Sequence, residues 1–262
     1  MPQAAEQFEK WVRRSHPAPN SRVRLVCLPH AGGSASFYFP LSRALAPAVE
    51  VLAIQYPGRQ DRRHEPNIAS IPDLADQIFA AVRRLDDRPL ALFGHSMGAV
   101  LAYEVALRIQ DAGLPSPVRL FTSGRRAPSC HREERVHMES DDQMVAELRK
   151  LSGTSSAMLT DPELLEMIMP AIRSDYRAVE TYRYERGRKL DCPVTVLTGD
   201  NDPRVSIDEA AAWEEHTTGP TELHVLPGGH FYLVDQNERV VGLLAESLAR
   251  KSVDAYAGSD LR

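Results

Sequence analysis

The feature that most constrains this chain is a serine held between two apolar segments in residues 89–107. Residues 90–93 have the length and composition of a buried parallel strand. The pentapeptide GHSMG follows at 94–98, and the apolar residues after it predict a helix that is buried on most sides. Such a turn needs small residues around Ser96 and places its hydroxyl over a helix N-terminus, where N–H groups favour a developing negative charge. We therefore interpret Ser96 as a nucleophile rather than as an ordinary loop serine.

Strand-like and helical patterns alternate along most of the chain. The strand-like runs are at 24–28, 51–55, 90–93, 118–122, 193–197 and 223–226. This alternation predicts a mostly parallel sheet that is covered by helices on both faces. We interpret the first 22 residues, which are polar and contain Pro17 and Pro19, as an arm that leads into the first strand.

Residues 129–184 interrupt this alternation, because they contain no strand-like run. Ser140 and Gln143 have the spacing of a capping box, and Asp161 followed by Pro162 marks the start of a second helix. We expect an all-helical insertion within one domain that covers residues 1–262.

The composition excludes several classes of protein. The 262 residues are 43% hydrophobic and 26% charged, as in an ordinary globular domain, and the net charge of −5 gives no general attraction to nucleic acid. No apolar run approaches the ~18 residues that span a membrane, and the N-terminus lacks the apolar core of a signal peptide. We therefore expect a cytoplasmic protein with neither a nucleic acid nor a membrane as its partner.

No metal or nucleotide site is predicted either. The three cysteines, Cys27, Cys130 and Cys192, are odd in number and widely spaced, so they indicate no disulfide framework and no metal ligands. The glycines at 32–33 are not followed by a phosphate-binding motif. We expect a protein without a cofactor.

A serine nucleophile needs a base, and the base needs an orienting group. The GHSMG turn resembles that of α/β-hydrolases, in which an acid and then a histidine follow the serine along the chain. We favour His230 as the base, because its turn comes just after the last strand and can carry an imidazole to the carboxyl end of the sheet. His216 is interpreted as a solvated helix residue, and His224 as a packed or edge residue of a strand.

Two aspartates compete for the role of orienting His230. Asp202 lies in a G-x-x-D-P turn after the strand at 193–197 and is our candidate. Asp200 is nearer the strand end and has two interpretations: it orients the histidine, or it bonds local backbone N–H groups.

The tetrahedral intermediate needs N–H donors for its oxyanion. We expect one from Met97, the residue after the nucleophile, and one from Ala31, in the small-residue loop at 30–33. The alternative for this loop is a glycine-rich turn without a catalytic role.

Six sequence blocks come in the order seen in type II thioesterases, the stand-alone editing enzymes of polyketide and non-ribosomal peptide assembly lines. The blocks are HAGGSASFY (30–38), YPGRQDR (56–62), GHSMG (94–98), SGRRAP (123–128), TGDNDP (198–203) and PGGHF (227–231). The resemblance implies an α/β-hydrolase fold and hydrolysis of acyl groups from the phosphopantetheine thiol of carrier proteins. It also assigns Ser96 as nucleophile, His230 as base, Asp202 as orienter, and Ala31 and Met97 as oxyanion donors.

Three other functions stay open on the sequence. The same triad would serve a small-molecule carboxylesterase or lipase, or a terminal thioesterase that cyclises its product. A catalytically silent protein that captures carrier domains is an alternative from a different class.

The insertion at 129–184 resembles the lid of these enzymes, which shapes the acyl chamber. Candidate contacts for an acyl chain are Met144, Leu148, Met158, Leu164, Met167, Ile168 and Met169. Packing of the insertion on the main domain is the alternative for each of them.

The resemblance also implies an acyl or peptidyl carrier protein as a transient partner. Carrier proteins are acidic around their modified serine, so a rim of arginines after the strand ends would suit docking. The candidates are Arg59, Arg62, Arg63, Arg125, Arg126, Arg132 and Arg135. The alternative is a solvated surface in which Arg59 and Arg125 form structural ion pairs.

Overall fold

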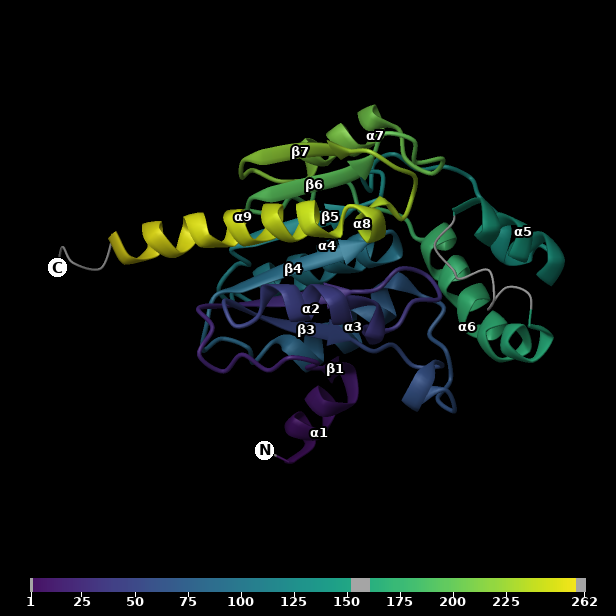
Figure 1. Ribbon diagram of the computed structural model, residues 1–262, viewed down its shortest axis with the longest axis horizontal. Helices are drawn as coiled ribbons and strands as arrows, with labels where there is room; N and C mark the ends of the chain where they lie inside the picture. Colours follow the sequence, from purple (N-terminus) through teal and green to yellow (C-terminus); the bar gives the residue numbers. More distant parts are fainter. Residues whose placement is uncertain (1, 152–160, 258–262) are drawn as a thin grey trace.

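The computed structural model describes residues 2–151 and 161–257, and within them seven strands form one sheet (Figure 1). Along the sheet the order is β1-β3-β2-β4-β5-β6-β7. The strands are β1 (Val12–Arg13), β2 (Val23–Leu28), β3 (Val49–Ile54), β4 (Leu90–His95), β5 (Arg119–Ser123), β6 (Val194–Gly199) and β7 (Thr221–Leu226). Every pairing is parallel except that of β1 with β3. The predicted α/β fold with a mostly parallel sheet is confirmed.

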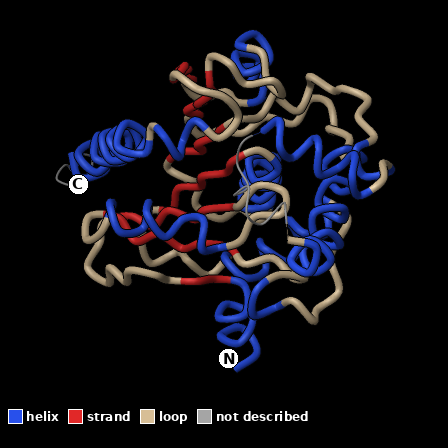
Figure 2. Tube along the Cα trace, turned by 45° about the vertical axis from the view of Figure 1, so that its right-hand side comes forward, coloured by secondary structure: helices blue, strands red, loops and turns tan. Residues whose placement is uncertain are grey.

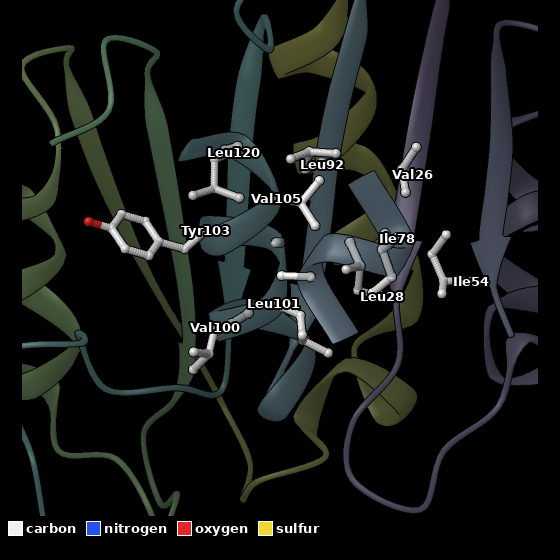
Figure 3. Packing of buried hydrophobic residues seen from close by; sticks show 14 of the residues in the cluster. Val26, Leu28, Ile54, Ile78, Leu92, Val100, Leu101, Tyr103, Val105 and Leu120 are labelled. Carbon is white, nitrogen blue, oxygen red and sulfur yellow. The ribbon is translucent and has the colours of Figure 1, made fainter. Parts of the chain in front are cut away.

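Helices cover both faces of the sheet, as Figure 2 shows. The helices are α1 (Pro2–Trp11), α2 (Phe39–Leu45), α3 (Ile71–Val82), α4 (Met97–Asp111), α5 (Asp141–Leu151), α6 (Pro162–Thr181), α7 (Ile207–Ala211), α8 (Tyr232–Asp235) and α9 (Asn237–Ala257). On one face, apolar side chains of α3 and α4 pack against the central strands (Figure 3). On the other face, α2, α8 and α9 pack against a second apolar cluster. The central strands are thus buried on both sides, which explains their nearly continuous apolar sequences.

The capping residues predicted from the sequence begin the expected helices. The Ser140 side chain accepts a hydrogen bond from the N–H of Gln143 at the start of α5, and the Gln143 side chain accepts one from the N–H of Ser140. The Asp161 carboxylate accepts from the N–H groups of Glu163 and Leu164, with Pro162 as the first residue of α6. These side chains satisfy N–H groups that have no partner inside a helix.

Between β5 and β6, the described residues form helices and connecting loops but no strand. Helices α5 and α6 lie together at one end of the sheet (Figure 1). They share a small apolar cluster made of Met144, Val145, Leu148, Met169, Ile172 and Tyr176. Ala31, from the loop after β2, packs against this cluster. The insertion therefore has an apolar core of its own that touches the main sheet unit at this loop.

The prediction of an N-terminal arm was wrong. Trp11 and Val12 are buried, and Val12 pairs with Ile54 at the edge of the sheet. The guanidinium of Arg62 lies 4.4 Å from the centre of the Trp11 ring. A strand of two residues has no periodicity to reveal it, so only these tertiary contacts show its place.

His216 was also interpreted wrongly, since it is buried rather than solvated. Its ring packs edge-on against the rings of Tyr103, Tyr184 and Trp213, and its Nε2 lies 2.9 Å from Ser129 Oγ. The charged residues around it in the sequence suggested a surface helix, but the distant Tyr103 and Tyr184 cover it together with the nearby Trp213.

Candidate active site

Ser96 sits at the turn between β4 and α4 with a backbone conformation of φ 55° and ψ −116°, which is rare for a residue with a side chain. Two glycines make this turn possible. A Cβ on Gly94 would lie 2.0 Å from the Gly98 carbonyl oxygen, and one on Gly98 would lie 2.0 Å from the Leu28 carbonyl oxygen. The end of β4, the start of α4 and the end of β2 thus lie too close together for any larger residue at these two positions.

The structure brings Ser96, His230 and Asp202 into one hydrogen-bonded chain. His230 Nε2 lies 3.0 Å from Ser96 Oγ, and His230 Nδ1 lies 2.9 Å from Asp202 Oδ2. The aspartate comes from the loop after β6 and the histidine from the loop after β7, so parallel strands deliver all three side chains to one edge. The side chains of both Asp202 and His230 are buried, which restricts their orientation.

The two competing aspartates have different partners. Asp202 contacts the imidazole, and its Oδ1 also accepts a hydrogen bond from the N–H of Arg204 at 2.8 Å. The Asp200 carboxylate instead accepts from the N–H of Gly228 at 2.9 Å and from the side chain of Asn201. Asp200 therefore has the local backbone role that was its alternative, and the geometry favours Asp202 as the orienter.

Two further histidines, His30 and His95, lie beside His230. The ring centres of His95 and His230 are 5.1 Å apart, and those of His30 and His95 are 6.0 Å apart. Burial, with the nearby His230 and Arg59 charges, lowers the pKa of His30 to about 3. Burial also holds the pKa of His95 well below its usual value. Both rings are neutral near pH 7, so they place no positive charge next to His230 when it takes up a proton.

The loop at 30–34 and the N-terminus of α4 offer the expected oxyanion donors. In this loop the N–H of Gly33 is bonded to the His30 carbonyl, and the N–H of Gly32 is bonded to the Asp175 carboxylate. Within residues 2–151 and 161–257, no acceptor for the N–H of Ala31 or of Met97 is found. This geometry supports the prediction that these two groups bind the oxyanion.

The docking prediction is wrong for Arg59, Arg62 and Arg126. Their exposed fractions are only 8%, 5% and 4%. Each forms a structural ion pair instead: Arg59 with Asp175, Arg62 with Glu65, and Arg126 with Glu134.

Of the other proposed docking residues, Arg63 is exposed and Arg125 is half-buried. Burial and the neighbouring Arg126 lower the pKa of Arg125 to about 10. In the part of the chain that the structure describes, Arg125 has no ion pair, unlike the structural pair considered for it. Of the two further arginines on this side, Arg132 pairs with Glu209, and Arg135 is exposed.

The candidate acyl contacts divide into three groups. Met144, Leu148 and Met169 pack inside the cluster between α5 and α6, which is the alternative considered for them. Leu164 and Ile168 are half-buried, and Met167 is 54% exposed. Met158 lies outside the described residues.

Two polar residues of this region were not predicted from the sequence. Asp175, on α6, accepts hydrogen bonds from Gly32 and Arg59. Gln55 accepts from the N–H of Ala35 at 2.9 Å and donates to the Arg59 carbonyl at 3.1 Å. A structural ion pair was the alternative considered for Arg59, but its partner is 116 residues away and no local pattern singles it out.

Comparison with known proteins decides the family, since residues 23–248 match the model of the thioesterase domain. The chain belongs to the thioesterase family. It is 51% identical over 245 residues to a probable cadicidin biosynthesis thioesterase of Streptomyces griseus, covering 94% of this chain and 68% of that one. It is 49% identical over 239 residues to the thioesterase PikA5 of Streptomyces venezuelae, covering 91% of this chain and 85% of that one.

A solved structure agrees with these relatives. The type II thioesterase BorB from the borrelidin biosynthetic cluster has 53% sequence identity to this thioesterase and a TM-score of 0.85, covering 91% of this chain and 97% of that one. The resemblance inferred from the six blocks is confirmed, as is the α/β-hydrolase fold. The protein is a hydrolase that acts on thioesters.

The residues that the structure describes contain neither a helix suited to span a membrane nor a cluster of metal ligands. None of the helices there combines the length and the apolar character needed to cross a membrane. No group of three or more His, Cys, Asp or Glu in that part of the chain is arranged to hold a metal ion.

Proposed function

We propose that this thioesterase is a stand-alone editing enzyme of polyketide or non-ribosomal peptide synthesis. It hydrolyses aberrant or stalled acyl groups from the phosphopantetheine thiol of an acyl or peptidyl carrier protein, which it meets in the cytoplasm. The observation that carries this proposal is the chain of contacts from Ser96 through His230 to Asp202, in a protein that is 53% identical to a type II thioesterase.

The proposed mechanism uses two acyl transfers. His230 Nε2 takes the Ser96 proton while Oγ attacks the thioester carbonyl, and the N–H groups of Ala31 and Met97 stabilise the oxyanion. His230 then gives that proton to the departing thiolate, which leaves an acyl group on Ser96. Water attacks this ester while His230 takes a proton from it, and collapse returns the proton to Ser96. Asp202 holds the imidazole in the required tautomer. The chain itself supplies nucleophile, base and orienter, so we propose a reaction that needs no cofactor.

We propose that residues 129–184 form a lid over this site. In support, α5 and α6 lie together at one end of the sheet, and their shared apolar cluster touches Ala31. The acyl chain would meet the less buried residues Leu164, Met167 and Ile168, while Met144 and Leu148 hold the two helices together.

The function is tested with a panel of acylated carrier proteins, analysed by mass spectrometry after treatment with the wild type or with Ser96→Ala. We expect loss of the acyl mass and recovery of the free phosphopantetheine thiol with the wild type alone. Matched oxygen esters of the same acyl groups distinguish a carboxylesterase. Faster cleavage of these esters than of every carrier thioester would overturn the proposal.

A further inference from the structure

The loop at 30–34, here called the oxyanion loop, is held at its ends by side chains: the His30 ring packs against Phe37 and Phe231, and Ser34 Oγ accepts a hydrogen bond from Gln60. The residues between them are small, and the internal N–H bond joins Gly33 to the His30 carbonyl. From the main sheet unit, the Gln55 side chain accepts the N–H of the next residue, Ala35. The other fixed N–H is that of Gly32, which donates to Asp175 Oδ2 at 2.8 Å. The residue between His30 and Gly32 is Ala31, the proposed oxyanion donor, so its N–H direction depends on these neighbours.

Asp175 belongs to α6, so this bond joins the insertion to the oxyanion loop. Its exposed fraction is 2%, and Nη2 of Arg59 donates to both of its oxygens, at 2.8 and 2.9 Å. A carboxylate beside the proposed hole would repel a developing oxyanion, and the Arg59 guanidinium compensates this charge. One side chain thus joins three segments: α6, the oxyanion loop and the loop after β3.

The same face of α6 also fixes the position of Gly32 sterically. Gly32 has φ 74°, and a Cβ there would lie 2.7 Å from Ile172 Cγ1. Ile172 and Asp175 are three residues apart and therefore share one face of the helix. The backbone of Gly32 is held against Ile172 while its N–H points to Asp175.

Withdrawal of α6 would leave Arg59 without this partner. Among the described residues, Arg59 Nε and Nη1 are already buried without an acceptor, and Nη2 has Asp175 alone. A buried guanidinium without a carboxylate is strongly unfavourable. When α6 is in place, the Gly32 N–H of the oxyanion loop and the Arg59 guanidinium therefore both have the Asp175 carboxylate as their acceptor.

We propose that Asp175 is a positioning residue through which the helical insertion assembles the oxyanion hole. This inference rests on the proposed function, since it assigns Asp175 a role in the same reaction. When α6 is seated, the Gly32 bond sets the direction of the Ala31 N–H, and when α6 moves away the hole loses this donor. The position of the insertion thereby controls the rate of acyl transfer in addition to access to Ser96.

A matched control lies on the same helix. Glu180 is also buried on α6 and accepts the N–H groups of Val136 and His137, at 3.0 and 3.1 Å. It anchors the helix to a different segment and makes no contact with the oxyanion loop. Glu180→Gln and Asp175→Asn thus make the same chemical change in one element, but one of them alone affects the oxyanion loop.

The test compares these variants on an acyl-carrier thioester and on two inhibitors of matched acyl chain. One is a trifluoromethyl ketone, which forms a tetrahedral adduct with Ser96. The other is a thioether, which resembles the ground state. Removing one oxyanion donor costs about 10²–10³-fold in kcat, so we expect Asp175→Asn to lose at least about tenfold, with KM within about threefold. Asp175→Asn should also bind the ketone more weakly by a similar factor and bind the thioether as the wild type does. For Glu180→Gln, kcat, KM and both inhibitor affinities should stay within about threefold of wild type.

Unchanged ketone binding in Asp175→Asn, or equal losses in both variants, would overturn the proposal. If Asp175→Asn does not fold, the proposal is tested instead by measuring ketone affinity in Arg59→Met and Arg59→Lys. Because a single Arg59 nitrogen makes the contact, lysine should retain ketone affinity and methionine should lose it. No difference between these two would contradict the proposal as well. A failure of the proposed function is separate, since the wild type itself would then leave the acyl carrier intact.

Discussion

At the end of β6, Asp200 and Asp202 are two residues apart and make different contacts. Asp202 holds His230 Nδ1, whereas Asp200 closes the loop by accepting the N–H of Gly228. In a serine hydrolase the orienting carboxylate fixes the tautomer of the base and stabilises the imidazolium. In the proposed mechanism, the two aspartates differ in the direction of their side chains, and their distances from the strand do not distinguish them.

The first prediction concerns these two residues. We expect Asp202→Ala to lower kcat by about 10⁴-fold, because the imidazole would lose its orientation. Asp200→Ala should keep kcat within about tenfold of wild type, since it removes a loop contact only. Steady-state kinetics on one thioester measures both variants. Near-normal turnover in Asp202→Ala together with collapse in Asp200→Ala would reverse the assignment.

His216 predicts a pH dependence of stability. Burial, together with the charge of Lys189, lowers its pKa to about 4 from an ordinary value near 6.5. The unfolded chain therefore binds a proton in this interval that the folded chain does not, so the His216 contribution to stability is complete above pH 6.5 and is lost as the pH falls toward 4. The shift corresponds to a free energy on the order of 3 kcal/mol.

Urea unfolding of the wild type and of His216→Gln at pH 7 and pH 4 measures this contribution. Glutamine retains polar atoms for Ser129 but does not titrate. We expect the difference in unfolding free energy between the two pH values to be smaller in the variant. An equal difference in both proteins would show that His216 does not contribute to the acid sensitivity.

At the scale of the elements, the insertion has buried residues that hold it together and exposed residues free to meet a substrate. Leu148 is buried in the cluster between α5 and α6, whereas Met167, on α6, is 54% exposed. These two residues were candidates for the same role in the sequence, and their burial separates them.

We expect Leu148→Ala to lower the free energy of unfolding by about 2–5 kcal/mol, because it leaves a cavity in the cluster. Met167→Ala should change that free energy by less than about 0.5 kcal/mol but alter the preference among acyl chain lengths. Urea unfolding and kinetics on a series of acyl thioesters check the pair. A Met167→Ala variant with an unchanged chain-length profile would remove Met167 from the proposed acyl site.

The sequence predicts best what local chemistry determines. Ser96 follows β4 directly, and Asp202 and His230 lie in the short turns after β6 and β7, so the parallel sheet brings them to one edge without further information. Asp175 could not be found in this way, because α6 places it against Arg59 and Gly32 over more than a hundred residues of chain. The burial of His216 and Trp11 likewise depends on tertiary contacts with residues that no local pattern connects to them.

At the scale of the whole molecule, the burial of three arginines changes where a carrier protein would dock. Arg59, Arg62 and Arg126 are buried and paired with carboxylates of this chain, so they are not available to an acidic partner. Arg63 is exposed in the loop after β3, at the same edge of the sheet as Ser96. Arg22 is also exposed, but it precedes β2 and therefore lies at the opposite edge.

Charge reversal at these two exposed positions tests the docking edge. We expect Arg63→Glu to raise KM for an acyl-carrier thioester about two- to tenfold at low salt, with less effect at high salt because rim charges act over a Debye length. KM for a small thioester of the same acyl group should not change, since that substrate makes no contact at the rim. Arg22→Glu carries the same change in net charge and should leave both KM values as in wild type. A similar rise in KM for both variants would attribute the effect to net charge, and a rise for both substrates in Arg63→Glu would place the residue in the acyl site instead.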